Sequence, residues 1–535
     1  MFNSLPGPLR AVALAGVALA ALLAGPAQGG GPFQSGLRWT AGASLQTPWI
    51  PSSVAFGSSD NLVWVSGSGN DSLLCYDSPG SGVATPAESF ENFAPGFELL
   101  SVAVGQSARH LYALGQRQAP DIFQRVTEVS RRDLLQSAAG APFTAMWTHD
   151  LGFAANGPAR MATSESGLTV VAAAWNGQTG SVRIDRLDGE SGSLLVRSDI
   201  AATGLDEMVL SADGERTALL LGLRLVVLAA DGTLLHDQAM GEIPASLALD
   251  NTGARIVVGG FGAVRIMAEG PGGYTETASV LGASNEIAGQ VGISPGAETW
   301  AVAWWRITDR DNLRHEIYAG PRHTLVLSAT QLGQPGGLQN YPSVIALNHD
   351  GSRVAFAAWG KGDSDAEAIL YDTASATQVL AIDLPGSVMA MDLDSSGTRL
   401  ALATKNLHAN QFGSTGEVRM YDTGERDLTF VTSPRLGSTW TSASRTPGAQ
   451  VALFLVGTRS PLPQPLPGAL GSLSLVRGPS LHVYARPANL LGEAQLSLQI
   501  PNASALIGAE YALQVANRVA GQIVFSETTL DLLLH

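Results

Sequence analysis

A repeat of about 48 residues constrains this chain more than any other feature of its sequence. Each copy consists of a short apolar strand, a polar turn with glycine or a small substitute, and a second apolar strand. Successive turn residues are 49, 59, 47, 39, 44, 54 and 46 positions apart. The eight turn residues are Ser59, Ala108, Gly167, Gly214, Gly253, Ala297, Gly351 and Gly397. This spacing is typical of a four-stranded propeller blade and does not fit solenoid units of about 20–35 residues.

The second half of each repeat also has the pattern of strands. Gly180–Asp185, Ile369–Thr373 and Glu417–Thr423 alternate apolar and polar residues, which is the period of a half-buried strand. Because two strands cannot bury a face alone, the repeat predicts a ring of four-stranded blades. We therefore expect an all-β fold, a β-propeller of seven or eight blades, with eight favoured by the number of turns. The 61 glycines among 535 residues suit a fold with many tight turns.

The two ends of the repeat region indicate how the ring closes. Val418–Tyr421 and Leu428–Val431 are expected to complete the eighth unit. Leu37–Ser44 is expected to add a closing strand to the last blade, because an open ring would leave unpaired strand edges. The segment Asp121–Leu135 also fits a helix face, but its place in the repeat favours a strand.

The first thirty residues have the pattern of a signal peptide. Arg10 supplies a positive charge, and the apolar run Ala11–Ala24 has a suitable length. Small residues precede an expected cleavage site after Gly29. The run is too short for a bilayer span of about 20 residues, although an uncleaved anchor remains the alternative. We expect a signal peptide at 1–29, a propeller at 30–433, and a secreted, periplasmic or cell-surface protein without a stable membrane span.

Charge excludes one class of partner. Asp and Glu number 46 and Lys and Arg 31, which gives a net charge of −15. The chain has no basic block, so nucleic acid is not an expected partner, because neutralising phosphates needs clustered cations.

After residue 433 the pattern changes. Several later segments alternate cleanly, which predicts a small β-sandwich-like domain at 434–535. The proline-rich stretch Pro461–Pro467 is expected to be an extended loop, because proline is poorly compatible with a strand interior. The predicted strands of this domain are Gln450–Val456, Ser480–Tyr484, Ala494–Ile500, Glu510–Val515 and Gln522–Ser526.

Two stretches carry a family resemblance. Asp394–Ala403 and Val418–Gly424 resemble the WD40-like and YVTN-type propeller repeats of secreted bacterial proteins. Similar sequences occur at Asp350–Ala355 and Leu370–Thr373. The resemblance covers roughly residues 50–432 and implies a propeller fold, but no activity, since such folds serve many functions. No repeat closes on the Gly-His and Trp-Asp pairs of true WD40 repeats. The tail resembles a C-terminal segment of large secreted proteins of some environmental bacteria, where it looks like a surface or sorting module.

Two motifs are candidates for chemistry. Gly292–Gly296 matches the G-x-S-x-G motif of a nucleophile elbow around Ser294. That elbow requires a strand followed directly by a helix, whereas this match lies between two predicted strands. The acidic clusters Asp309–Asn312 and Asp363–Glu367 lie in long loops, where calcium prefers several oxygens from one loop. Neither cluster matches a full calcium-binding loop motif, so we favour solvated loops. Calcium is the only cofactor that the sequence leaves open.

Histidine and cysteine do not form a recognisable site. The nine histidines lack zinc-ligand spacing, and only the fold would bring His110, His315, His323 and His349 together. Cys75 is the single cysteine, so it has no internal disulfide partner, and a small hydrophobe in a strand is the favoured interpretation.

Five tryptophans fall at matching places in second strands. Packing against the next blade is the favoured interpretation, and a stacking surface for sugars or peptides at the ring mouth is the alternative. These residues are Trp175, Trp300, Trp304, Trp305 and Trp359.

Two functions follow from these observations. The first is an exported, non-catalytic propeller that binds a protein, glycan or envelope component at the ring face, since we assign no catalytic, cofactor-binding or metal-binding residue. The alternative is a propeller hydrolase such as a lactonase, with a metal in the central channel. The family resemblance and the two acidic loops are the reasons for keeping this alternative.

Overall fold

The computed structural model describes residues 36–534 with gaps, the longer ones at 43–48, 57–60, 69–72, 91–96, 106–109, 120–124, 133–144, 332–339 and 361–365. The expected signal peptide at 1–29 lies outside the described residues. The chain divides into two compact units, one at Gly36–Thr423 and another whose described part begins at Gly424.

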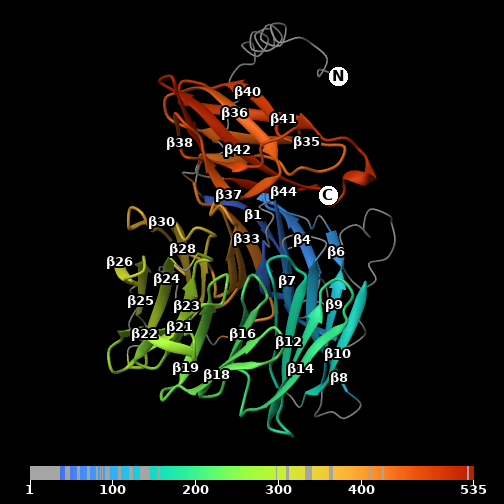
Figure 1. The fold of residues 1–535 in the computed structure, drawn as a ribbon, viewed down its shortest axis with the longest axis vertical. Helices are drawn as coiled ribbons and strands as arrows, with labels where there is room; N and C mark the ends of the chain where they lie inside the picture. The colour runs from blue at the N-terminus through green and yellow to red at the C-terminus, as the bar shows by residue number, and fades with distance from the viewer. Residues whose placement is uncertain are drawn as a thin grey trace. The chain divides into compact units, whose positions relative to one another are not determined.

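The larger unit is built almost entirely of antiparallel four-stranded sheets (Figure 1). Its described residues form seven such sheets and one five-stranded sheet, one sheet for each predicted repeat, which we number as blades from the N-terminal side. Blade 1 contains β2(Ile50–Ala55), β3(Leu62–Ser68), β4(Leu73–Asp77) and β6(Glu88–Phe90). Blade 2 contains β7(Phe97–Val104), β8(Leu111–Gln118), β9(Arg125–Arg132) and β10(Trp147–Ala154). Blade 3 contains β11(Ala159–Thr163), β12(Thr169–Asn176), β13(Ser181–Asp188) and β14(Leu194–Ala201). Blade 4 contains β15(Glu207–Leu210), β16(Arg216–Leu221), β17(Arg224–Ala229) and β18(Leu234–Ala239).

The other blades repeat this order, innermost strand first. Blade 5 contains β19(Pro244–Leu249), β20(Arg255–Gly260), β21(Ala263–Gly270) and β22(Gly273–Leu281). Blade 6 contains β23(Glu286–Ile293), β24(Thr299–Arg306), β25(Leu313–Ala319) and β26(Thr324–Gln331). Blade 7 contains β27(Pro342–Leu347), β28(Arg353–Ala358), β29(Ala368–Asp372) and β30(Thr377–Ile382). Each innermost strand contacts those of the neighbouring blades, and β31 of blade 8 contacts β2 again, so the ring closes. The propeller prediction is confirmed, and β9 is a strand where the sequence was ambiguous.

The last blade combines the two ends of the ring. It contains β31(Val388–Leu393), β32(Arg399–Lys405), β33(Gly416–Asp422) and, from the N-terminal side, β1(Gly36–Ala41), with the short β5(Gly82–Val83) parallel to β1. The closing strand predicted at Leu37–Ser44 is therefore confirmed over its described part. The prediction that Leu428–Val431 completes this blade was wrong, because β34(Leu428–Phe430) pairs with β35(Thr439–Arg445) of the other unit. Accordingly, the larger unit ends at Thr423 rather than at the expected residue 433.

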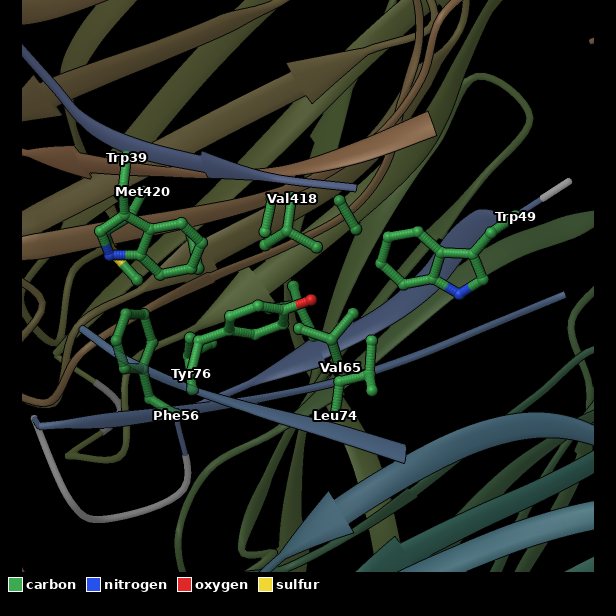
Figure 2. Packing of buried hydrophobic residues seen from close by; sticks show 13 residues of the cluster. Trp39, Trp49, Phe56, Val65, Leu74, Tyr76, Val418 and Met420 are labelled. Atoms are coloured by element: carbon green, nitrogen blue, oxygen red, sulfur yellow. The ribbon is translucent and has the colours of Figure 1, made fainter. Parts of the chain in front are cut away.

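Apolar packing between blades 8 and 1 supports the closure (Figure 2). Trp39 of β1 is fully buried, and its ring lies 5.3 Å from that of Tyr76 in blade 1. The figure shows Val418 and Met420 of β33 facing the same cluster. Burying such aromatic side chains contributes about 1.5–3 kcal/mol each, so the closing strand is held by its side chains as well as by the sheet ladder.

One turn recurs between the first and second strands of seven blades. The residue that follows the first strand donates its backbone N–H to the carbonyl five positions later, at 2.8–3.2 Å. These pairs are Gly105–His110, Ser164–Thr169, Ser211–Arg216, Asp250–Arg255, Ser294–Thr299, Asn348–Arg353 and Asp394–Arg399. In five of these turns the predicted glycine has a positive φ of 69–77°, a conformation that side chains disfavour. The remaining turn residues Ser59, Ala108 and Ala297 lie outside the described residues.

The family-like motif has a structural explanation. In blade 7, Arg353 forms an ion pair with Asp372, which lies opposite it on the next strand. Thr373 donates its hydroxyl to the carbonyl of Gly351 at 3.1 Å and so fastens the turn. Blade 8 repeats this arrangement with Arg399, Asp422, Thr423 and Gly397. The motif therefore ties together the turn and the second and third strands of its own blade.

The C-terminal unit has two main sheets. One contains β34, β35 and β41(Glu493–Gln499); the other contains β38(Ala469–Leu470), β43(Gln522–Phe525), β42(Glu510–Val519), β36(Ala449–Gly457) and β40(His482–Pro487), with β44(Leu530–Leu533) beside β42. Trp440, Phe454, Leu496 and Val515 form one core between the two sheets, which is a sandwich-like arrangement. A short 3-10 helix spans Ser504–Leu506. All five strands predicted here from alternation are present.

The proline-rich stretch is not the loop that the sequence predicted. β37(Arg459–Pro465) pairs with β39(Ser472–Leu475) in a separate two-stranded sheet. Its register is irregular between Arg459 and Gln464, which accommodates prolines that donate no hydrogen bond. Among the residues that the structure describes, no helix is long and apolar enough to cross a membrane.

Candidate functional site

Ser294, the serine of the elbow-like motif, lies in a turn between two strands. Ser294 follows β23 in the recurring turn, 1% exposed, and its hydroxyl accepts the backbone N–H of Thr299 at 3.1 Å. Ser164 and Ser211 accept the equivalent bonds in blades 3 and 4, at 3.1 and 2.9 Å. A strand follows the turn rather than a helix, so Ser294 caps a turn.

The acidic clusters are described only in part. Residues 309–311 and 361–365 lie outside the described residues. Glu367, at the end of the second cluster, is buried and accepts the backbone N–H of Leu384 at 2.6 Å. Its carboxylate lies 3.6 Å from Nδ1 of His408. In the described part of the chain, no three His, Cys, Asp or Glu side chains gather as a metal would require.

The four candidate histidines lie apart, in blades 2, 6 and 7. His110 bonds Glu190 at 2.7 Å, whereas His315 is buried and stacks on Phe356. Burial lowers the pKa of His315 to about 3, so it stays neutral and acts as an aromatic core residue. His323 accepts the indole N–H of Trp300, and His349 is exposed in a turn. Cys75 is buried in β4, as expected for a small hydrophobe.

The tryptophans pack against other residues of the protein, and two of them form a separate aromatic group. Trp300 stacks on Tyr318 at 4.1 Å, and Trp304 donates to the carboxylate of Glu316 at 2.8 Å. Trp175 donates to the carbonyl of Ala202 at 3.2 Å. The other two, Trp305 and Trp359, flank Tyr341, each with ring centroids 5.4 Å away. This aromatic group lies where the second strands of blades 6 and 7 end and β27 begins.

That side of the ring carries a candidate interaction surface, which we call the entry face. It is the side on which innermost strands begin, formed by the turns between second and third strands and by the connections between blades. Five large apolar side chains are exposed there over blades 4–6, by 39–77%. This apolar patch consists of Leu223, Ile243, Phe261, Leu281 and Ile307. Clustered exposed apolar side chains of this kind mark interaction sites more often than scattered ones.

Backbone hydrogen bonds hold the loops of the apolar patch in place. Phe261 donates its N–H to the carbonyl of Ile243 at 3.0 Å, which joins a turn of blade 5 to the connection before it. Ile307 donates to the carbonyl of Asn285 at 3.0 Å, and the carbonyl of Leu223 accepts from Met240 at 2.9 Å. A preformed surface of this kind loses little conformational entropy when it binds a partner.

Charged groups around the apolar patch are largely paired with each other. Arg265 donates to both carboxylate oxygens of Glu242, at 2.6 and 2.7 Å, and Arg314 pairs with Glu286 at 2.6 Å. Burial raises the pKa of Glu286, but hydrogen bonds from Arg314, the backbone of Ala283 and Arg306 outweigh it and lower the value to about 2. The surroundings are therefore charged but internally neutralised, which leaves apolar contact as the dominant feature of the patch.

Sequence reasoning did not find the apolar patch. Its members are single residues in different repeats, and nothing in the local pattern distinguishes an exposed leucine at a turn from a buried one. The only available signal was apolar residues next to turn glycines, as in Phe261-Gly262 and Leu281-Gly282.

Comparisons with known proteins support the fold. No family model matches the chain, and no curated protein matches it. A crystal structure of Sqt1 from Chaetomium thermophilum is similar, with a TM-score of 0.52 and 14% identity over 73% of this chain and 99% of that one. The same protein bound to the N-terminus of the ribosomal protein L10 gives 0.51 and 14%, over 73% and 100%. The chain has a WD40-like propeller fold. At this identity, the likeness shows the fold alone.

Proposed function

We propose that this protein is an exported, non-catalytic propeller that binds a protein partner through the entry face. The observation that carries the proposal is the apolar patch, five exposed apolar side chains on loops fixed by backbone hydrogen bonds. Sqt1, which shares the fold, has been crystallised with the N-terminus of another protein, which supports a protein as the partner. The sequence pattern at 1–29 supports export.

A second copy of this chain does not fit as the partner. Each copy carries a net charge of −15, so two copies repel each other, whereas a neutral or basic protein does not meet this barrier. The partner we propose is therefore a different protein that presents apolar side chains. A concentration-dependent dimer that buries Phe261 would contradict this.

Site-specific photocrosslinking tests the proposal. A photoreactive residue replaces Phe261 in the patch, or Leu234 as a control, which is 52% exposed on the outer strand β18. The proposal predicts one crosslinked protein species in envelope extracts from the Phe261 position and none of that species from Leu234. Equal crosslinking at both positions, or none at Phe261, would show that the patch is not a docking surface.

A further inference from the structure

Two adjacent leucines project from one turn of the C-terminal unit. Leu490 is fully exposed and Leu491 is 62% exposed, in the turn that joins β40 to β41. Among the residues that the structure describes, no other large apolar side chain is as exposed as Leu490. Water solvates apolar side chains unfavourably, and exposed apolar side chains that lie together mark interaction sites. The pair is therefore a candidate contact with another surface.

Hydrogen bonds of Asn489 hold this turn in one conformation. Its side-chain oxygen accepts the backbone N–H groups of Leu491 and Glu493, both at 2.9 Å, and its side-chain nitrogen donates to the Glu493 carboxylate at 3.0 Å. The backbone N–H of Gly492 donates to the Asn489 carbonyl at 2.9 Å, and Gly492 has a positive φ of 78°, which a side chain disfavours. The turn therefore forms without help from the leucine side chains.

Two further turns lie at the same end of this unit. The backbone N–H of Thr446, in the turn between β35 and β36, donates to the carbonyl of Gly492 at 3.0 Å. Ala449 at the start of β36 lies opposite Val519 at the end of β42, so the turn between β42 and β43 is also there. We call these three turns the leucine tip, which consists of Thr446–Gly448, Ala488–Gly492 and Ala520–Gly521.

Two arginines lie in the sheet directly behind the leucine tip. Arg518 of β42 lies opposite Val451 on one side of β36, and Arg486 of β40 lies opposite Ala452 on the other side. In the described part of the chain neither arginine forms an ion pair, and the guanidinium of Arg486 donates to the backbone carbonyl of Ala485 at 2.8 Å. Both charges therefore remain available to an anionic surface that meets the tip.

A third arginine at this end has acidic neighbours. Arg445 lies opposite Glu493 in its sheet, and its backbone N–H donates to the carbonyl of Asp427 at 2.8 Å. The unit as a whole is nevertheless the less acidic part of the chain. From Gly424 onward the sequence has seven arginines and six acidic residues, a net charge of +1, whereas residues 1–423 carry −16. An anionic surface is repelled by the larger unit but not by this one.

We propose that the leucine tip inserts into the surface of an anionic lipid bilayer. Leu490 and Leu491 enter the boundary between headgroups and acyl chains, where projecting side chains leave water without having to match the shape of a pocket. The negative surface potential attracts the two arginines behind the tip, which contact lipid phosphates. The inference does not depend on the proposed function, because the apolar patch belongs to the other unit.

Co-sedimentation of the full chain with vesicles tests the proposal. The vesicles contain phosphatidylcholine alone or mixed with an equal part of phosphatidylglycerol. Leu490→Ser with Leu491→Ser should bind the mixed vesicles at least about tenfold more weakly than the unaltered chain, because two apolar side chains no longer leave water. Leu194→Ser with Leu195→Ser is the matched control and should bind like the unaltered chain, because these adjacent exposed leucines lie on the outer strand β14. Every variant keeps the apolar run Ala11–Ala24, so that run does not cause a difference.

Charge variants test the choice of lipid. Arg486→Gln with Arg518→Gln should reduce the preference for mixed vesicles over pure phosphatidylcholine about tenfold, because each arginine near an anionic surface adds to the attraction. Arg445→Gln is the matched control and should change this preference far less, since acidic residues flank Arg445. An unchanged preference in the variant that lacks Arg486 and Arg518 would refute their contact with lipid phosphates.

A fluorescent label shows whether the leucine tip enters the bilayer. Cys75 is buried, so Leu490→Cys supplies an accessible thiol for an environment-sensitive dye in the folded chain. Its emission should shift to shorter wavelength when mixed vesicles are added, and that of Leu194→Cys should not. Near-ultraviolet circular dichroism should show that the leucine variants fold, because Asn489 holds the turn. Equal vesicle affinity of the unaltered chain and the leucine double variant, or an unshifted emission at position 490, would overturn the proposal in favour of a protein pocket that covers the leucines.

Discussion

Asp422 is the residue at which the ring closure is tested most sharply by mutation. It is 2% exposed, forms an ion pair with Arg399, itself 1% exposed, and accepts a hydrogen bond from Arg38 of the closing strand at 3.0 Å. Replacing Asp422 with asparagine leaves the Arg399 guanidinium charged and buried without its counter-ion. Breaking a buried pair in this way costs about 3–5 kcal/mol, and the partly exposed Arg38 adds at most about 1 kcal/mol. We expect Asp422→Asn to lower the free energy of unfolding by this amount.

Asp372→Asn is the matched control, because Asp372 makes the same pair with Arg353 in blade 7 but holds no closing strand. The Asp372 side chain is 22% exposed, so we expect a smaller loss of about 1–2 kcal/mol. Urea unfolding followed by tryptophan fluorescence measures both losses, and hydrogen exchange reports on β1. Faster exchange of β1 amides should appear in Asp422→Asn alone. Equal losses in the two variants, or unchanged exchange of β1, would refute the reasoning.

Three further outcomes follow from the structure. Ser294→Ala should lower the free energy of unfolding in urea by about 1–2 kcal/mol and leave partner binding unchanged, because the Ser294 hydroxyl bonds only within the turn. A variant that keeps full stability but loses function would show instead that Ser294 has a chemical role. Burial raises the pKa of Asp392 to about 7, opposed by bonds from the backbone of Phe56 and Leu393. Protonated Asp392 contributes fully to the free energy of unfolding below about pH 4. This contribution is lost as the pH rises to about 7, because the folded state holds the proton of Asp392 more tightly than the unfolded state does. Asp392→Asn should flatten this part of the stability–pH curve, and an unchanged slope would contradict it. Removing residues 1–29 should leave a folded protein inside the cell, and equal export of both forms in cell fractionation would reject the signal-peptide interpretation.

The propeller was predictable because its turns are local. Gly351 must adopt a positive φ, and that requirement recurs at the same place in five described turns, so a glycine pattern appears in the sequence. The pairing of Arg353 with Asp372 was not predictable as an interaction. Its two members are 19 residues apart, and only the strand register places them opposite each other.

The end of the ring was misplaced for a related reason. Leu428–Phe430 has an apolar strand pattern that suits either unit, and local alternation carries no information about the partner strand. The proline-rich β37 was missed because proline disfavours a strand interior, although a short irregular pairing tolerates it.

The candidate surface depended even more on the fold. Phe261 and Leu281 are exposed because they lie at loops on one face of the ring. This property does not follow from local sequence, since it depends on residues brought together from different repeats.

The affinity of the crosslinked partner for the purified protein tests the central claim most directly. The double variant Phe261→Ser with Leu281→Ser removes two exposed side chains of the apolar patch, and Leu194→Ser with Leu195→Ser removes two from the outer strand β14. Truncating two apolar anchors at an interface should weaken binding at least about tenfold, because each contributes roughly 1 kcal/mol or more. The account predicts this loss for the patch variant and an unchanged Kd for the outer-strand variant. Equal affinities for the unaltered protein and the patch variant would contradict it.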